Sequence, residues 1–155
     1  MGRIFIFDID DTLILHTKEK NDYYNINTEQ SFKKLLESVD HDGVFIYTNG
    51  TYGHGERVIN NLEINVNGIF GRDTMPNMKP HINSFNYVKN IIDKKINKND
   101  TCIFFDDLLD NLNTAKRLGW STVWITPNFN NGAPEFVDHV FPNVYQAILY
   151  FGLKK

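Results

Sequence analysis

The feature that most constrains the fold of this chain is a repeated alternation of short apolar runs with longer amphipathic runs. The apolar runs are nearly continuous, which is typical of strands that are covered on both faces of a parallel sheet. They lie at residues 3–8, 43–48, 68–70, 101–106, 121–126 and 138–141. Runs with the helical spacing of apolar residues lie between and after them, at 28–39, 54–64, 80–95, 108–119 and 143–152.

This alternation predicts an α/β protein, a three-layer α/β/α sandwich with a central parallel sheet. The length of 155 residues and the hydrophobic content of 41% fit a single domain that covers residues 1–155. No internal repeat, low-complexity tract or linker divides the sequence. We therefore expect one hydrophobic core around one sheet.

The net charge and the cysteine content of the chain indicate which partners and which cellular compartment to expect. The net charge of −3 argues against a nucleic-acid partner, because such proteins normally carry a strong basic patch. The single cysteine, Cys102, cannot form a disulfide within the chain, and this fits a reducing interior. We find neither a long apolar span nor a signal-peptide pattern, so the expected location is cytoplasmic, with no membrane partner.

Polar residues follow several of the expected strands. In folds of this class, ligands bind at the carboxyl ends of the strands. Asp8 ends the first strand, Thr48-Asn49-Gly50 ends the second, and Asp106 and Asp107 end the fourth. Lys79 closes the loop that follows the short third strand. The sequence therefore predicts that these groups converge on one edge of the sheet.

The acidic residues of this set point to a metal. Asp8 and Asp10 are two positions apart, so in extended backbone their side chains share a side. Together with Asp106 and Asp107 they make four carboxylates in one crevice, which cannot all stay ionised without compensation. An oxygen-only ligand set favours Mg²⁺. For Asp107 and Asp110 taken alone, charges in the first turn of a helix are an equally good explanation.

Two further positions suit an anion. Lys79 precedes Pro80, and proline is well tolerated at the first helical position, so Lys79 should stand just outside a helix N-terminus. The free N–H groups there attract anions, most simply phosphate. Thr48 and Asn49 offer a hydroxyl and backbone N–H groups at another strand-to-helix turn. We predict that Thr48, Asn49 and Lys79 bind a substrate phosphate.

Four segments in this order resemble the motifs of the haloacid dehalogenase-like hydrolase superfamily: "DIDDT" at 8–12, "YTNG" at 47–50, "KP" at 79–80 and "FFDDLLDN" at 104–111. The resemblance covers the whole chain. It implies a Rossmann-like phosphatase in which Asp8 is the nucleophile, Asp10 is the general acid/base and Thr12 braces the loop. It also implies that Mg²⁺ is bound by Asp8, by the backbone carbonyl of Asp10 and by Asp106, with Asp107 as a ligand or as the residue that orients a metal-bound water.

Within the superfamily, residues 47–64 and 104–120 are most similar to the pyrimidine 5′-nucleotidase branch. The members of that branch carry a cap domain between the first two motifs, whereas residues 13–43 leave room only for a helix and a flap at about 13–27. We therefore expect a capless, open site that the flap or a partner subunit of a homo-oligomer covers.

The expected function is a magnesium-dependent phosphomonoesterase that works through an aspartyl-phosphate on Asp8, with a nucleotide or another small phosphate ester as substrate. Two alternatives stay open: a phosphatase for phosphoproteins or nucleic-acid ends, and a non-catalytic binding module on the same fold. His54 and His81 are interpreted as surface or capping residues, and Trp120 and Trp124 as core residues.

Overall fold

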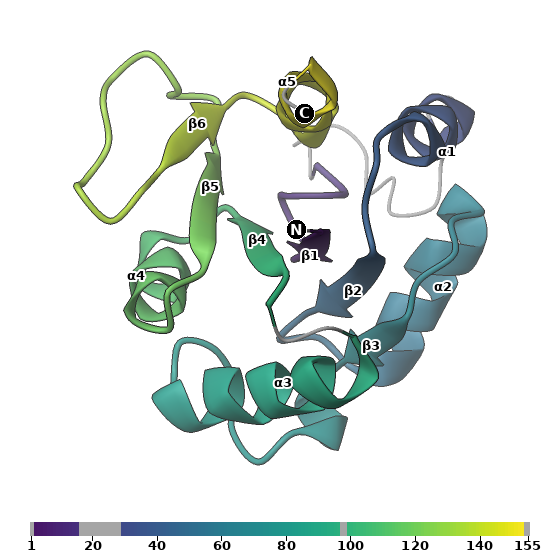
Figure 1. Ribbon diagram of the computed structural model, residues 1–155, viewed down its shortest axis with the longest axis vertical. Coiled ribbons are helices and arrows are strands. Elements are labelled where there is room, and N and C mark those ends of the chain that lie inside the picture. Colours follow the sequence, from purple (N-terminus) through teal and green to yellow (C-terminus); the bar gives the residue numbers. More distant parts are fainter. Residues whose placement is uncertain (1, 16–28, 97–98, 154–155) are drawn as a thin grey trace.

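The structure, a computed structural model, describes residues 2–15, 29–96 and 99–153. Its centre is a six-stranded parallel sheet with the strand order β3-β2-β1-β4-β5-β6 (Figure 1). In chain order the strands are β1 (Arg3–Phe7), β2 (Gly43–Tyr47), β3 (Gly68–Phe70), β4 (Thr101–Asp106), β5 (Ser121–Ile125) and β6 (His139–Phe141).

Helices cover both faces of the sheet, as Figure 1 shows. One face carries α1 (Glu29–Ser38), α2 (Tyr52–Leu62) and α5 (Val144–Leu153). The other carries α3 (Ile82–Lys95) and α4 (Leu109–Arg117). The chain is thus an α/β/α sandwich with two separate apolar layers, one on each side of the sheet.

The central strands supply side chains to both layers. In β1, Phe5 and Phe7 join the layer under α1 and α5, while Ile4 and Ile6 join the layer under α3. All four side chains are almost fully buried. This two-sided burial explains why the strand reads as a continuous apolar run, because side chains alternate between two faces that are both covered.

The strand order sets the position of a ligand site. From β1 the chain moves outward to β2 and β3, and then crosses to the other side of β1 to form β4. The connections that leave β1 and β4 therefore diverge, and a crevice opens at the carboxyl ends of these two strands. Asp8 and Asp106 occupy those ends.

The fold class predicted from the sequence is confirmed, and every predicted strand and helix is present within one or two residues of its expected ends. One short 3₁₀ helix, η1 (Arg72–Thr74), was not predicted. The predicted flap at 13–27 falls largely on 16–28, outside the described residues, so it stays a prediction. In the part of the chain that the structure describes, the strands form one sheet, the α-helices cover it, and none of the helices could cross a membrane.

Candidate active site

A tight turn after β1 positions the first acids. The N–H groups of Thr12, Leu13 and Ile14 all point at the carbonyl oxygen of Ile9, at 3.1, 2.9 and 3.0 Å. Asp11 takes a φ of 60° in this turn, a left-handed conformation that aspartate adopts more readily than most residues. The turn folds the chain back toward the end of β1.

This turn also supports the first acid of the motif. The buried carboxylate of Asp8 accepts a hydrogen bond from the Thr12 hydroxyl, with Oγ1 3.2 Å from Asp8 Oδ2. The Asp8 backbone N–H donates to the carbonyl of Phe105 on β4 at 3.0 Å. The backbone of Asp8 is therefore held by the neighbouring strand and its side chain by Thr12, the residue that was expected to brace the loop.

Lys79 joins the acids of two strands. Its ammonium Nζ lies 3.0 Å from Asp8 Oδ1 and 2.9 Å from Asp106 Oδ2, and it also donates to the Tyr47 carbonyl at 2.8 Å. The same ammonium lies 4.9 Å from the ring centroid of Tyr47 and 5.4 Å from that of Phe104. Both salt-bridge partners and the lysine are buried, so water screens these interactions only weakly.

Burial shifts the proton affinities of the cluster. Removal from water raises the pKa of Asp8 to about 6, although the nearby Lys79 ammonium lowers it and the Asp106 charge raises it. Burial, and then the charges of Asp106 and Asp8, raise the pKa of Asp107 to about 8. For Lys79, burial acts to lower the pKa, but the two carboxylates outweigh it and the pKa is raised, so the side chain stays charged.

The carboxylates fit a divalent cation. One oxygen from each of Asp8, Asp106 and Asp107 lies within 4.8 Å of the others. A hard cation such as Mg²⁺ prefers carboxylate oxygens, and its charge would favour the ionised forms of Asp8 and Asp107, whose pKa values burial raises. The side chain of Asp10 is outside this group.

The turn after β2 brings the predicted anion-binding residues to the same edge. The Thr48 hydroxyl is buried and accepts the Gly50 N–H at 2.9 Å. The Asn49 side chain binds the backbone of Lys79 twice, with Nδ2 donating to the Lys79 carbonyl at 3.1 Å and Oδ1 accepting the Lys79 N–H at 2.9 Å. The side-chain amide of Asn49 thus clamps the backbone of Lys79 through two hydrogen bonds, a role that the sequence did not predict. Phosphate binding by Asn49 and Thr48 stays a prediction.

Asp10 faces a different neighbour. Its Oδ1 lies 3.3 Å from Nε2 of His54, in the first turn of α2. The sequence interpretation of His54 as a surface or capping residue missed this contact, since residues 44 positions apart give no local signal. The interpretation of His81 is confirmed, because its Nδ1 accepts the Asn83 N–H at the start of α3.

Two groups that orient Asp106 were also missed. The Asn111 amide donates to Asp106 Oδ2 at 3.1 Å, and the Leu108 N–H donates to Asp106 Oδ1 at 2.9 Å. Asn111 is buried although it is polar, and its place in the motif at 104–111 was the signal that could have identified it.

Trp120 is a core residue as predicted, but Trp124 is only half-buried, and its indole N–H donates to the Asp107 carbonyl at 2.9 Å.

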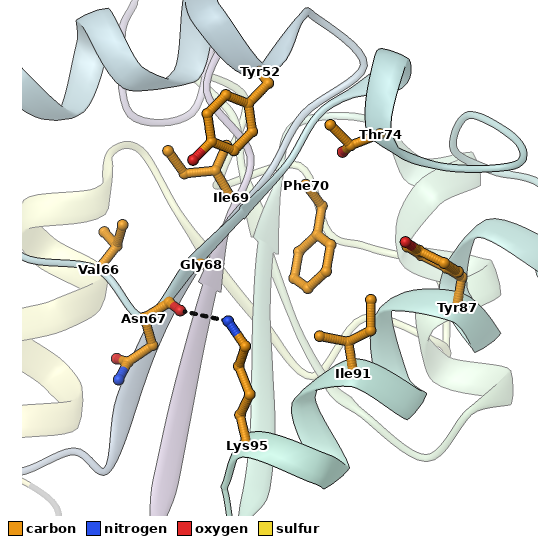
Figure 2. A pocket seen from close by; sticks show the side chains of 10 residues that line it. All are labelled: Tyr52, Val66, Asn67, Gly68, Ile69, Phe70, Thr74, Tyr87, Ile91 and Lys95. Atoms are coloured by element: carbon orange, nitrogen blue, oxygen red, sulfur yellow. Dashed lines mark hydrogen bonds between the residues drawn. The ribbon is translucent and has the colours of Figure 1, made fainter.

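Two hollows on the surface differ in their distance from the predicted site residues. One of about 400 Å³ lies between Lys79, Asp107 and Trp124, next to the carboxylates. A larger one of about 550 Å³ lies along the outer strand β3, where Tyr52, Tyr87 and Lys95 line it (Figure 2). The larger hollow contains none of the predicted site residues, so its size does not make it the active site.

Comparison with protein-family models and with curated proteins gives no match. Solved structures do match. The HAD-hydrolase YfnB from Bacillus subtilis is 16% identical over 97% of this chain and 98% of its own, with a TM-score of 0.65. A D,D-heptose 1,7-bisphosphate phosphatase from B. bronchiseptica, bound to magnesium and phosphate, is 14% identical over 96% of this chain and 98% of its own, at 0.61.

A third match is to a dehalogenase, which is 17% identical over 82% of this chain and has a TM-score of 0.63. This chain spans only 56% of the length of that dehalogenase. The three proteins share an arrangement of strands and helices with this chain at low identity. The chain therefore has the haloacid dehalogenase-like fold that its four sequence motifs predict.

Proposed function

We propose that this protein is a magnesium-dependent phosphomonoesterase that works through an aspartyl-phosphate on Asp8. The observation that carries the proposal is that the Lys79 ammonium binds Asp8 and Asp106, while one oxygen of Asp107 lies within 4.8 Å of oxygens of both carboxylates. Thr48 and Asp10 lie at the ends of the neighbouring strands on the same edge. A nucleophile, a cation and groups for phosphate oxygens are what phosphoryl transfer requires.

Asp8 attacks phosphorus with one carboxylate oxygen, and the bond from phosphorus to the ester oxygen breaks. Asp10 gives its proton to the departing oxygen, which leaves as an alcohol. Asp10 then accepts a proton from the water that attacks the aspartyl-phosphate, and inorganic phosphate and free Asp8 result. Lys79 favours the ionised form of Asp8 that the attack requires, and Thr12 holds the other oxygen of this carboxylate in place.

Asp8, Asp106 and Asp107 would hold Mg²⁺, with the backbone carbonyl of Asp10 as a further ligand. When bound, the ion would offset negative charge on the phosphoryl oxygens. Such an ion would add positive charge to a cluster of three carboxylates, two of which already share the ammonium of Lys79. Asn111 and the Leu108 N–H would keep the Asp106 carboxylate in a fixed orientation toward the ion.

Dehalogenation is the competing reaction, because dehalogenases are among the matching structures. A dehalogenase and a phosphatase of this fold would share the first step, attack by an aspartate. Displacement of a halide needs no proton for the leaving group, and it gives no reason to gather three carboxylates at 4.8 Å or closer. Asp10 and the carboxylate cluster therefore favour the phosphatase.

The test measures hydrolysis of 4-nitrophenyl phosphate with Mg²⁺, with EDTA, and with the variant Asp8→Asn. We expect turnover only for the native protein with Mg²⁺, and near-native thermal unfolding of the variant. A parallel assay follows halide release from 2-chloropropionate, for which we expect none. Turnover of the phosphate ester by Asp8→Asn, or full activity in EDTA, would contradict the mechanism.

A further inference from the structure

The hollow next to Asp107 shares residues with the proposed phosphate and metal site. Asn49, Lys79 and Asp107 belong to both, and the remaining wall comes from Pro80 just before α3, the start of α4 and the end of β5. Its volume of about 400 Å³ is in the usual range for a small-molecule pocket. A substrate whose phosphate lies at Lys79 would have its organic part within reach of this space.

Apart from Asp110, the wall of this hollow is apolar where it is not shared with the site. Pro80, Leu108, Leu109 and Trp124 line it. Leu108 is 54% exposed, which by itself is ordinary, since Leu149 on α5 is 53% exposed as well. Leu108 differs from Leu149 in its surroundings, because the other apolar side chains meet it around one concave space.

Trp124 gives this space a flat, fixed wall. Its one polar atom, Nε1, already donates to the Asp107 carbonyl at 2.9 Å, so the indole needs no polar group from a ligand. Trp124 packs in part against the core under α3 and α4, and it also lines the hollow, where it offers apolar contact. A planar ring system suits such a wall, because aromatic groups gain from offset stacking in addition to the area that they bury.

Charge excludes a second anionic group in this space. Asp107 and Asp110 line the hollow, and the cation among its lining residues, Lys79, already binds Asp8 and Asp106. Asp107 would bind Mg²⁺, so a second phosphate or a carboxylate on the substrate would meet the carboxylate of Asp110, and the cation that lines the hollow is already paired. The organic part of the substrate should be uncharged.

We propose that this hollow receives the leaving group, and that the substrates are phosphate monoesters of uncharged, planar ring-containing alcohols. This proposal rests on the phosphomonoesterase function and specifies its substrate class. The ester oxygen lies at Asp10, the phosphate lies at Lys79 and the ring extends over Pro80 toward Leu108 and Trp124. Small polar alcohols and bisphosphates fall outside the class, because they would leave the apolar side chains of the wall without a partner or bring a negative charge close to Asp110.

The test compares kcat/KM for 4-methylumbelliferyl phosphate, whose leaving group is a neutral pair of fused rings, with kcat/KM for glycerol 3-phosphate. The ratio is measured for the native protein, for Leu108→Ser and for the matched variant Leu149→Ser, with Mg²⁺ present. Comparison of ratios removes the intrinsic difference in leaving-group reactivity between the esters. Leu108 is exposed and off the sheet, so its replacement should leave folding intact, which thermal unfolding verifies.

We expect Leu108→Ser to lower the ratio about fivefold, mainly through a higher KM for the aromatic ester, because part of an apolar side chain is lost from the contact. Leu149→Ser should leave the ratio unchanged. As a second variant, Leu108→Lys should raise kcat/KM for fructose 1,6-bisphosphate relative to the aromatic ester.

Hydrolysis of both esters with a ratio that Leu108→Ser does not change would overturn the substrate class and leave the phosphatase standing. Hydrolysis of neither ester, nor of 4-nitrophenyl phosphate, would overturn the function and the substrate class together.

Discussion

Replacement of Lys79 by methionine tests the physical basis of the site. Lys79 is the cation that holds Asp8 and Asp106 together, at 3.0 and 2.9 Å, and its side chain is 1% exposed. Methionine fills a similar volume without a charge, so the packing against Tyr47 and Phe104 is largely kept. The variant therefore isolates the loss of the positive charge.

The expected loss of stability follows from burial. When one partner of a buried ion pair is removed, the other charge is left without compensation, which costs about 3–5 kcal/mol. The value should lie near the upper end in the absence of metal, because Lys79 compensates two carboxylates at once. Added Mg²⁺ should recover part of the loss, and at 100 times its Kd a ligand contributes about 2.7 kcal/mol.

The assay is urea unfolding at pH 8, followed by circular dichroism, in EDTA and in Mg²⁺. The matched control is Lys89→Met, which removes a 2.8 Å ion pair with Asp93 from the surface of α3, where the lysine side chain is 41% exposed. Such an exposed pair is worth about 0.3–0.5 kcal/mol. We expect a large, Mg²⁺-sensitive loss for Lys79→Met and a small, Mg²⁺-insensitive loss for Lys89→Met.

Two results would refute the reasoning. A loss below about 1 kcal/mol for Lys79→Met in EDTA would show that the carboxylates do not depend on this ammonium. Equal stabilisation of the variant and the native protein by Mg²⁺ would show that the ion and Lys79 do not compensate the same charges.

Asp10→Asn should lower kcat about 10²–10⁴-fold in a steady-state assay. Asp11→Asn, at the exposed neighbouring position, should change kcat little, and equal effects of the two substitutions would show that Asp10 is not the general acid/base. The raised pKa of Asp107 means that the folded state holds a proton that the unfolded state releases, so the metal-free free energy of unfolding should fall from pH 5 to pH 8. Asp107→Asn should reduce this fall, measured by urea unfolding. The same pH dependence in the variant and the native protein would contradict the raised pKa. Asn49→Ala should cost about 1–3 kcal/mol in urea unfolding, because it leaves the Lys79 backbone N–H and carbonyl without their partner, and native stability would show that the clamp is dispensable.

The sequence by itself determined the architecture, and the physical reason is that the signals are local. A strand buried on both faces must be apolar throughout, as residues 4–7 are, and a helix on a sheet must repeat apolar residues every three or four positions, as Phe32 and Leu36 do. Strand ends then gave the position of the site, because all carboxyl ends of a parallel sheet lie on one edge. Asp8 and Asp106 were predicted as site residues in this way, whereas Lys79 was predicted from the loop that it closes and from the proline that follows it.

Only the tertiary structure decided which partners those residues have. The Asn49 amide clamps the Lys79 backbone across 30 positions, and His54 reaches Asp10 across 44. Such contacts depend on how loops from different strands approach one another, and sequence spacing carries no information about that approach. The same holds for Trp124, which packs against the core as predicted and also lines the hollow beside the site. The identity of the side chains on the edge is a property of the sequence, whereas their pairing, their proton affinities and the shape of the space beside them arise only when the six strands are brought together.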